Sequence, residues 1–179
     1  MTDRNDGLTL FGTLRRGIRT YVPEDIEELR IYLGNIDIRH HLMRQANPSK
    51  ALKDMVTMYE QQLIDLEIDN IEVVQALPIE NESRPLPKTG YYKDTPFAGS
   101  WAERTELVKQ FNQLVTDMCK RNDWKTWQHP EVYLNSFGEL TFDVMEKPKS
   151  VHIAREYYRW DLVNDEPNSK LTKTTLALF

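Results

Sequence analysis

The sequence predicts a three-layer α/β fold with a mainly parallel sheet. Two apolar, strand-like runs, at residues 29–35 and 71–79, are separated by a segment whose apolar residues recur at helical spacing. A second segment with helical spacing and a further short strand-like run follow them along the chain. Strands that alternate with helices in this order are typical of a parallel sheet covered by its crossover helices. At 179 residues, the chain is long enough for one domain with a single substantial core.

Each of these elements has its own signals in the sequence. The first run, LRIYLGN, places Ile, Tyr and Leu together, as in a strand that is buried on both faces. The helix after it is predicted to begin at Pro48, behind the N-cap residue Asn47, and to extend to residue 68. Its apolar face consists of Leu52, Met55, Val56, Tyr59, Leu63 and Leu66. The second run, IEVVQALPI, is rich in β-branched residues and is ended by Pro78.

The other segments complete a single domain over residues 1–163. Residues 1–20 are predicted to form a short strand or loop followed by an irregular basic segment. Residues 101–123 have the apolar spacing of a second amphipathic helix, and WKTWQHP, at 124–130, is predicted to be a short strand. Residues 164–179 are polar with an apolar end and are predicted to form a tail.

The composition argues against several classes of function. The formal net charge is −5, whereas nonspecific binding to nucleic acid depends on Lys and Arg. No apolar run reaches the ~18–20 residues of a membrane span, and the polar N-terminus lacks the apolar core of a signal peptide. The single cysteine, Cys119, excludes an internal disulfide and fits a reducing compartment. We therefore expect a cytoplasmic protein without a membrane or nucleic-acid partner.

Five polar residues crowd together where the first strand ends: Asn35, Asp37, Arg39, His40 and His41. In parallel sheets, functional groups lie just past the carboxyl ends of the strands. Asp37 could orient a histidine, and the planar guanidinium of Arg39 could clamp a carboxylate or a phosphate. The alternative is a salt bridge at the rim of the sheet, from Asp37 to Arg39 or to a helix end, with the histidines half exposed.

A long polar loop, residues 80–100, follows the second strand and begins at the same rim. Its first residues are further candidates for substrate binding: Glu80, Asn81, Ser83 and Arg84. Basic and aromatic residues alternate along the rest of the loop, where they could stack on and clamp a sugar or a nucleotide. The alternative is a surface loop held in place by its prolines.

The C-terminal part offers one catalytic candidate, His152. It follows Pro148 and precedes a helix-like stretch, on a loop of the kind that carries a general base. Cys119, by contrast, lies among apolar neighbours in the second helix, which favours a buried, inert thiol. The sequence has no CxxC or HExxH metal motif and no glycine-rich phosphate loop, so we expect neither a metal nor a cofactor.

The order of these segments resembles the SGNH (GDSL-like) hydrolases, a flavodoxin-like α/β family of esterases, lipases and acyl-carbohydrate hydrolases. The resemblance rests on YLGNIDIRHH as the central strand with the family's G-x-x-D block, and on SVHI as the block of the catalytic histidine. The resemblance covers roughly residues 25–160. The form of the first block is similar to that of divergent family members from phages and bacteria. Residue by residue, the resemblance carries over Gly34, Asp37 and His152, and it implies that His152 is the general base. Asn35 is a further catalytic candidate because it stands next to the position of the family's asparagine.

The sequence departs from the family pattern at three places. The Gly-Asp-Ser block that supplies the nucleophile is absent, and residues 1–20 contain no serine. The family's oxyanion asparagine falls on Ile36, next to Asn35, and the aspartate expected three residues before the histidine is Lys149. The long loop offers Ser83 and Ser100 as substitutes, although neither is predicted on a strand-to-helix turn.

Three functions remain open at this point. The first is a hydrolase of a small-molecule or carbohydrate ester, with the nucleophile supplied by a different residue or by a second chain. The second is a non-catalytic phage structural or accessory protein on the same scaffold, in which case the protein belongs to the virion. The third is a nucleotide- or sugar-modifying enzyme that binds a phosphate at Arg39, His40 and His41. A homo-oligomer is compatible with each of them.

Overall fold

The computed structural model describes residues 9–80, 92–147, 153–154, 157 and 175–178. Within these residues, a parallel sheet is formed by the strands β1 (Glu28–Ile31), β2 (Asn70–Val74), β3 (Lys125–Trp127) and β4 (Thr175–Leu178). Their order in the sheet is β3-β2-β1-β4. Leu29 of β1 is opposite Ile71 of β2, which confirms the predicted parallel pairing of the first two strand-like runs. The protein is therefore of the α/β class.

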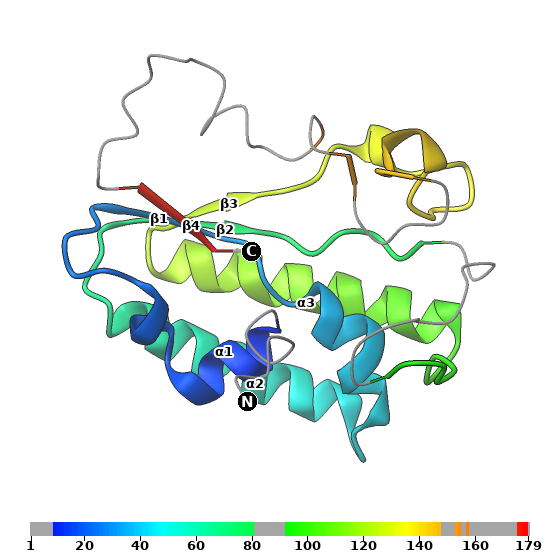
Figure 1. Cartoon of the computed structure of the whole chain (residues 1–179), viewed down its shortest axis with the longest axis horizontal. Coiled ribbons are helices and arrows are strands. Elements are labelled where there is room, and N and C mark those ends of the chain that lie inside the picture. The colour runs from blue at the N-terminus through cyan, green and yellow to red at the C-terminus, as the bar shows by residue number, and fades with distance from the viewer. Residues whose placement is uncertain (1–8, 81–91, 148–152, 155–156, 158–174, 179) are drawn as a thin grey trace.

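The described α-helices lie on one side of this sheet (Figure 1): α1 (Leu10–Arg16), α2 (Pro48–Ile64) and α3 (Trp101–Arg121). α2 begins at Pro48 because the side chain of Asn47 accepts a hydrogen bond from the N–H of Lys50. α3 begins with a capping box formed by Ser100 and Glu103. Both helices confirm the predictions, although each ends a few residues early. No helix in the described residues is long and apolar enough to cross a membrane.

The N-terminal segment differs from the predicted strand or loop. Residues Leu10–Arg16 form α1, whose start is capped by Thr9 Oγ1 as it accepts a hydrogen bond from Gly12 N. Leu10 and Leu14 lie one turn apart and are both buried. Gly12 weakens the local preference for a helix. The cap and the burial of the two leucines against α2 override that preference.

The C-terminal residues also differ from the predicted tail over 164–179. Thr175–Leu178 form β4, which pairs in parallel with β1, so that Glu28 is opposite Thr175 and Ile31 is opposite Leu178. The carboxyl ends of β1 and β4 therefore reach the same edge of the sheet. The apolar end of the tail supplies this strand.

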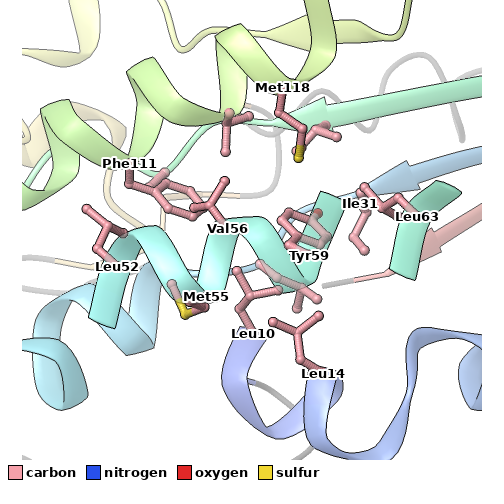
Figure 2. Close-up of a cluster of buried hydrophobic side chains, with 14 of the residues drawn as sticks. Leu10, Leu14, Ile31, Leu52, Met55, Val56, Tyr59, Leu63, Phe111 and Met118 are labelled. Carbon is pink, nitrogen blue, oxygen red and sulfur yellow. The ribbon is translucent and has the colours of Figure 1, made fainter. Parts of the chain in front are cut away.

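The main hydrophobic core lies between the helices and the sheet. Figure 2 shows the side chains that meet there: Leu10 and Leu14 from α1, Leu52, Met55, Val56, Tyr59 and Leu63 from α2, Phe111 and Met118 from α3, and Ile31 from β1. Each buried side chain of this kind contributes about 1.5–3 kcal/mol relative to the same side chain left in water. The core holds β1 against α2 and α3, and it thereby fixes where the polar residues after β1 emerge.

A second, smaller hydrophobic cluster lies on the other face of the sheet, where residues 131–145 pack (Figure 1). Its buried members are Tyr32, Leu77, Tyr133, Leu140, Val144, Met145 and Ile153. Tyr32 follows β1 and Leu77 follows β2, so the cluster ties the segment 131–145 to the carboxyl ends of these two strands. This segment also carries Phe137, the most exposed of the large hydrophobic side chains in the described residues, and the exposed ring of Phe142.

Candidate functional site

The polar residues predicted at the carboxyl ends of the strands do lie together at one edge of the sheet. The chain leaves β1 through Gly34 and Asn35 into a π-helical turn, Asp37–His41. It leaves β2 through Gln75 to Glu80, and it leaves β3 toward His129. Hydrogen bonds between these three segments make the edge one connected polar network.

Gly34 shapes the turn that opens this edge. Its φ of +106° belongs to a region that residues with a side chain rarely adopt, and a Cβ atom there would come within 2.7 Å of Phe111 Cζ. The close approach of the backbone to α3 allows the N–H of Ile38 to donate to Gly34 O at 3.0 Å. The π-helical turn therefore begins directly beneath the aromatic ring of Phe111.

Arg39 is buried and joins the end of β1 to the end of β2. Its Nε–H donates to Glu80 Oε2 at 2.8 Å, and its Nη2 donates to Pro78 O at 2.9 Å. Its Nη1 donates to Asn35 Oδ1 at 3.2 Å. The guanidinium thus pairs with a carboxylate of the chain itself, through one N–H, and its other nitrogens bind Pro78 and Asn35. The ion pair of Arg39 in the described residues is with Glu80 and not with Asp37, the partner that the alternative proposed.

Asn35 is the member of the network whose orientation has a chemical consequence. Its Oδ1 accepts hydrogen bonds from Leu77 N at 2.9 Å and from Arg39 Nη1 at 3.2 Å. Both partners are donors, so this side of the amide must be the oxygen. The NH₂ group consequently points the other way, and within the described residues it makes no hydrogen bond. Asn35 is only partly buried, which leaves this oriented donor available to a ligand.

Asp37 binds the end of a helix, one of the two partners that the alternative named, and does not orient a histidine in the described residues. Its two carboxylate oxygens accept hydrogen bonds from the backbone N–H groups of Leu10, at 2.7 Å, and of Phe11, at 3.1 Å. Among the described residues it contacts the start of α1 rather than a histidine. Burial raises the pKa of Asp37 to about 6, and the N–H groups of Phe11 and Leu10 limit that rise. Asp37 therefore anchors α1 to the turn after β1.

His40 and His41 meet the aromatic residues of the long loop. The ring of His40 stacks between Tyr92, with ring centroids 5.8 Å apart, and Phe97, at 5.3 Å. The guanidinium of Arg44 covers Tyr92 and that of Arg104 covers Phe97. His41 Nδ1 also lies 3.2 Å from the hydroxyl of Tyr92. Of the loop residues predicted to clamp a ligand, Tyr92 and Phe97 are thus stacked on other residues of the chain.

Several predicted site residues lie outside the described residues: Asn81, Ser83, Arg84 and His152. The predicted convergence of His152 with the edge that holds Asn35 is therefore neither supported nor contradicted. Ser100, the other substitute nucleophile, caps α3. Its hydroxyl donates to Glu103 Oε2 and accepts from Glu103 N, which is the work of a helix cap.

His129 is a polar residue of this edge that the sequence analysis missed. It is buried, with ring contacts to Trp127 and Tyr133, and its Nε2 lies 2.9 Å from Gln75 O. Nε2 therefore carries the proton, while Nδ1 is buried without a hydrogen-bond partner in the described structure. Burial lowers the pKa of His129 to about 4, and the charge of Arg39 lowers it further, against the effect of Gln75.

The signal that could have found His129 was its place just after a short strand, the same rule that singled out Asn35. The sequence analysis had included the histidine in the strand itself. Its ring is buried, binds Gln75 O and packs on Trp127 and Tyr133, so we assign it a packing and positioning role at the edge.

Two further expectations concern metals and the cysteine. The described residues hold no group of three or more His, Cys, Asp or Glu side chains arranged to bind a metal ion. Cys119 is buried in α3, as predicted, and burial raises the pKa of its thiol to about 12, which disfavours the reactive thiolate.

Comparison with known proteins adds no constraint to this geometry. No family model, curated protein or solved structure matches the chain.

Proposed function

We propose that the chain is an SGNH-like hydrolase domain that acts on an ester or an acylated carbohydrate. The observation that carries the proposal is the amide of Asn35. Its oxygen is fixed by Leu77 and Arg39, so its NH₂ group is oriented before any substrate binds. A preorganised donor of this kind stabilises the oxyanion that forms when an acyl carbon is attacked.

The surroundings of Asn35 support this assignment. The asparagine lies past the carboxyl end of a strand in a parallel sheet, where α/β proteins bind their ligands. Gly34 and Asp37 have the spacing of the G-x-x-D block. Gly34 has the positive φ at the start of the turn, and Asp37 binds the turn to α1. The proposal includes a three-layer, flavodoxin-like arrangement, which is the fold of the hydrolases that the sequence resembles.

The proposed reaction is acyl transfer to a nucleophile and then to water. A nucleophilic oxygen attacks the acyl carbon, His152 takes its proton, and the negative charge collects on the former carbonyl oxygen. Asn35 Nδ2–H donates to that oxyanion. The alcohol leaves with the proton from His152, and water then repeats the sequence to release the acid. The nucleophile is assigned to residues of this chain outside its described part, because the described Ser100 serves as a helix cap.

A non-catalytic scaffold is the second candidate, and one observation favours it. Asp37, Arg39 and Glu80 all use their charged groups on partners within the chain. Such a network stabilises the edge of the sheet whether or not any chemistry takes place there. The third candidate, a phosphate-binding enzyme, loses its main anion ligand for the same reason, since Arg39 is already paired with Glu80.

The test is Asn35→Asp, because aspartate keeps the acceptor and removes the donor. One carboxylate oxygen can still accept from Leu77 N and Arg39, so the fold should be retained. The other oxygen replaces the NH₂ group, and hydrolysis of a short-chain p-nitrophenyl ester should fall by about 10²–10³-fold. Asn47→Asp is the matched control, because Asn47 acts only as an acceptor at the start of α2 and the change should leave the rate unaltered.

Two results would contradict the hydrolase. If the purified wild-type protein fails to hydrolyse short-chain esters, the scaffold candidate replaces it. If wild type and Asn35→Asp hydrolyse the ester at the same rate, Asn35 does not stabilise the oxyanion. His152→Ala provides an independent check, because loss of the proposed general base should abolish hydrolysis while the protein stays folded.

A further inference from the structure

Exposed apolar side chains are concentrated in the segment 131–145. The described residues with large exposed apolar side chains in this segment are Val132, Leu134, Phe137 and Phe142. Phe137 is 80% exposed and Phe142 is 48% exposed, whereas Phe111 in the main core is fully buried. Aromatic rings held in water are costly unless something binds to them, so this concentration points to a binding surface.

The exposed rings are held by an ordered backbone. Asn135 Oδ1 accepts hydrogen bonds from Phe137 N, at 2.9 Å, and from Glu139 N, at 3.0 Å. Asn135 Nδ2 donates to Glu139 Oε2 at 2.9 Å, and Thr141 N donates to Tyr133 O at 2.8 Å. The turn is therefore fixed by its own hydrogen bonds, and Phe137 is presented at its tip without needing a ligand to order it.

The two rings border an open pocket of about 570 Å³. Its polar lining comes from Asn135, Glu139, Thr141 and Asp143. Neither Lys nor Arg is among the described residues that line it. A pocket with carboxylates and no cation repels phosphate, nucleic acid and other anions. It favours a ligand that has apolar faces and many hydroxyl donors.

We propose that this pocket binds a carbohydrate. The C–H faces of a pyranose ring can pack on Phe137 and Phe142, while its hydroxyl groups donate to the carboxylates of Glu139 and Asp143. The volume suits one or two sugar rings in an open site. The ligand class follows from this combination of aromatic rings and hydrogen-bond acceptors in one pocket.

The pocket is connected directly to the edge that carries Asn35. Leu140 N donates to Ile79 O at 3.1 Å, and the backbones of Leu140 and Glu80 form an isolated parallel β-bridge. Glu80 binds Arg39, which in turn binds Asn35. We assign this pocket to the sugar part of a substrate whose ester lies at Asn35. This role as a subsite rests on the proposed hydrolase, but sugar binding itself does not.

The test is direct binding of sugars to the full chain in the absence of any ester. Uncharged trisaccharides of xylose, glucose and N-acetylglucosamine are the probes, and calorimetry or NMR titration measures their dissociation constants. At least one of them should bind to wild type. Phe137→Ser and Phe142→Ser should each weaken that binding by about tenfold, as expected for the loss of one aromatic stacking contact.

Phe11→Ser is the matched control, because Phe11 is 53% exposed on α1 and does not line the pocket. It should leave the dissociation constant unchanged. The proposal is overturned if no trisaccharide binds, if the two pocket variants bind as wild type does, or if oligolysine binds at Phe137 in place of the sugars.

Ester hydrolysis separates the two proposals. Sugar binding without hydrolysis overturns only the hydrolase, whereas hydrolysis without sugar binding overturns only the pocket.

Discussion

The guanidinium of Arg39 donates to the carboxylate of Glu80 at 2.8 Å, and the two side chains are only 3% and 5% exposed. This ion pair joins the turn after β1 to the segment after β2. A buried pair of charges adds little net stability, but the removal of one partner leaves the other charge buried without compensation. The pair therefore makes the geometry of the edge depend on both residues at once.

Arg39→Lys should destabilise the protein although the charge is conserved. Lysine cannot donate to Glu80, Pro78 and Asn35 from one planar group, so at least two of these acceptors lose their donor. We expect a loss of about 3 kcal/mol in the free energy of unfolding, measured by urea denaturation. The result would contradict this account if the variant unfolded at the same urea concentration as wild type.

Arg121→Lys is the matched control for that measurement. Arg121 also binds a carboxylate through two nitrogens, those of Glu60, but it is 57% exposed. Exposed ion pairs contribute little, so the free energy of unfolding should change by no more than about 0.5 kcal/mol. Equal losses in the two variants would mean that burial does not distinguish the Arg39 pair.

Asp37 and His129 should give opposite pH dependences. The pKa of His129 in the folded protein is about 4, below its ordinary value of 6.5. Between these values the unfolded chain takes up a proton that the folded protein excludes, so stability falls as the pH is lowered. The pKa of folded Asp37 is about 6, above its ordinary 3.8, so between those values stability falls as the pH is raised.

Two variants separate these effects, because each removes one titrating group. Relative to His129→Gln, wild type should lose about 3 kcal/mol between pH 6.5 and pH 4. Relative to Asp37→Asn, wild type should lose about 3 kcal/mol between pH 3.8 and pH 6. Urea unfolding at each pH provides the free energies. The account would be contradicted if the difference between wild type and variant changed in the same direction with pH for both residues. It would also be contradicted if neither difference changed with pH, because burial would then not control these groups.

The sequence alone was sufficient to predict the helices and strands whose signals lie within their own residues. α2 and α3 each carry an apolar face at helical spacing and an N-cap residue, so their starts at Pro48 and Trp101 were predictable. β1 and β2 are short apolar runs with a helix between them, which is enough to predict parallel pairing. α1 was not predicted, because its stability depends on Asp37 and on burial against α2 rather than on its own sequence.

The location of the candidate site could be predicted from the sequence, but the hydrogen-bond and ion-pair partners of its residues could not. The rule that polar residues gather past the ends of parallel strands located Asn35, Asp37 and Arg39. Their partners are distant in sequence: Glu80 lies 41 positions from Arg39, and Leu10 lies 27 positions from Asp37. Such pairings depend on the packing of whole elements, and no local pattern encodes them. The same holds for Asn35, whose orientation is set by a backbone N–H of the segment after β2.

Gly34→Ala should destabilise the protein through two separable effects. The first is the φ of +106°, which is strained for any residue with a Cβ atom. The second is a collision, because the new methyl group would lie 2.7 Å from Phe111 Cζ in the main core. Gly138→Ala isolates the first effect: Gly138 has a φ of +77°, and nothing lies within 4 Å of the added Cβ.

We expect Gly138→Ala to lower the free energy of unfolding by about 1 kcal/mol, the usual cost of a left-handed backbone. Gly34→Ala should cost about 1–3 kcal/mol more, because the ring of Phe111 or the turn itself has to move. The double variant Gly34→Ala with Phe111→Leu should cost less than the sum of the two single changes, since leucine removes the atom that collides. Additive losses in this cycle would mean that Phe111 does not constrain Gly34, and the turn that orients Asn35 would then owe its shape to Asp37 and Arg39 alone.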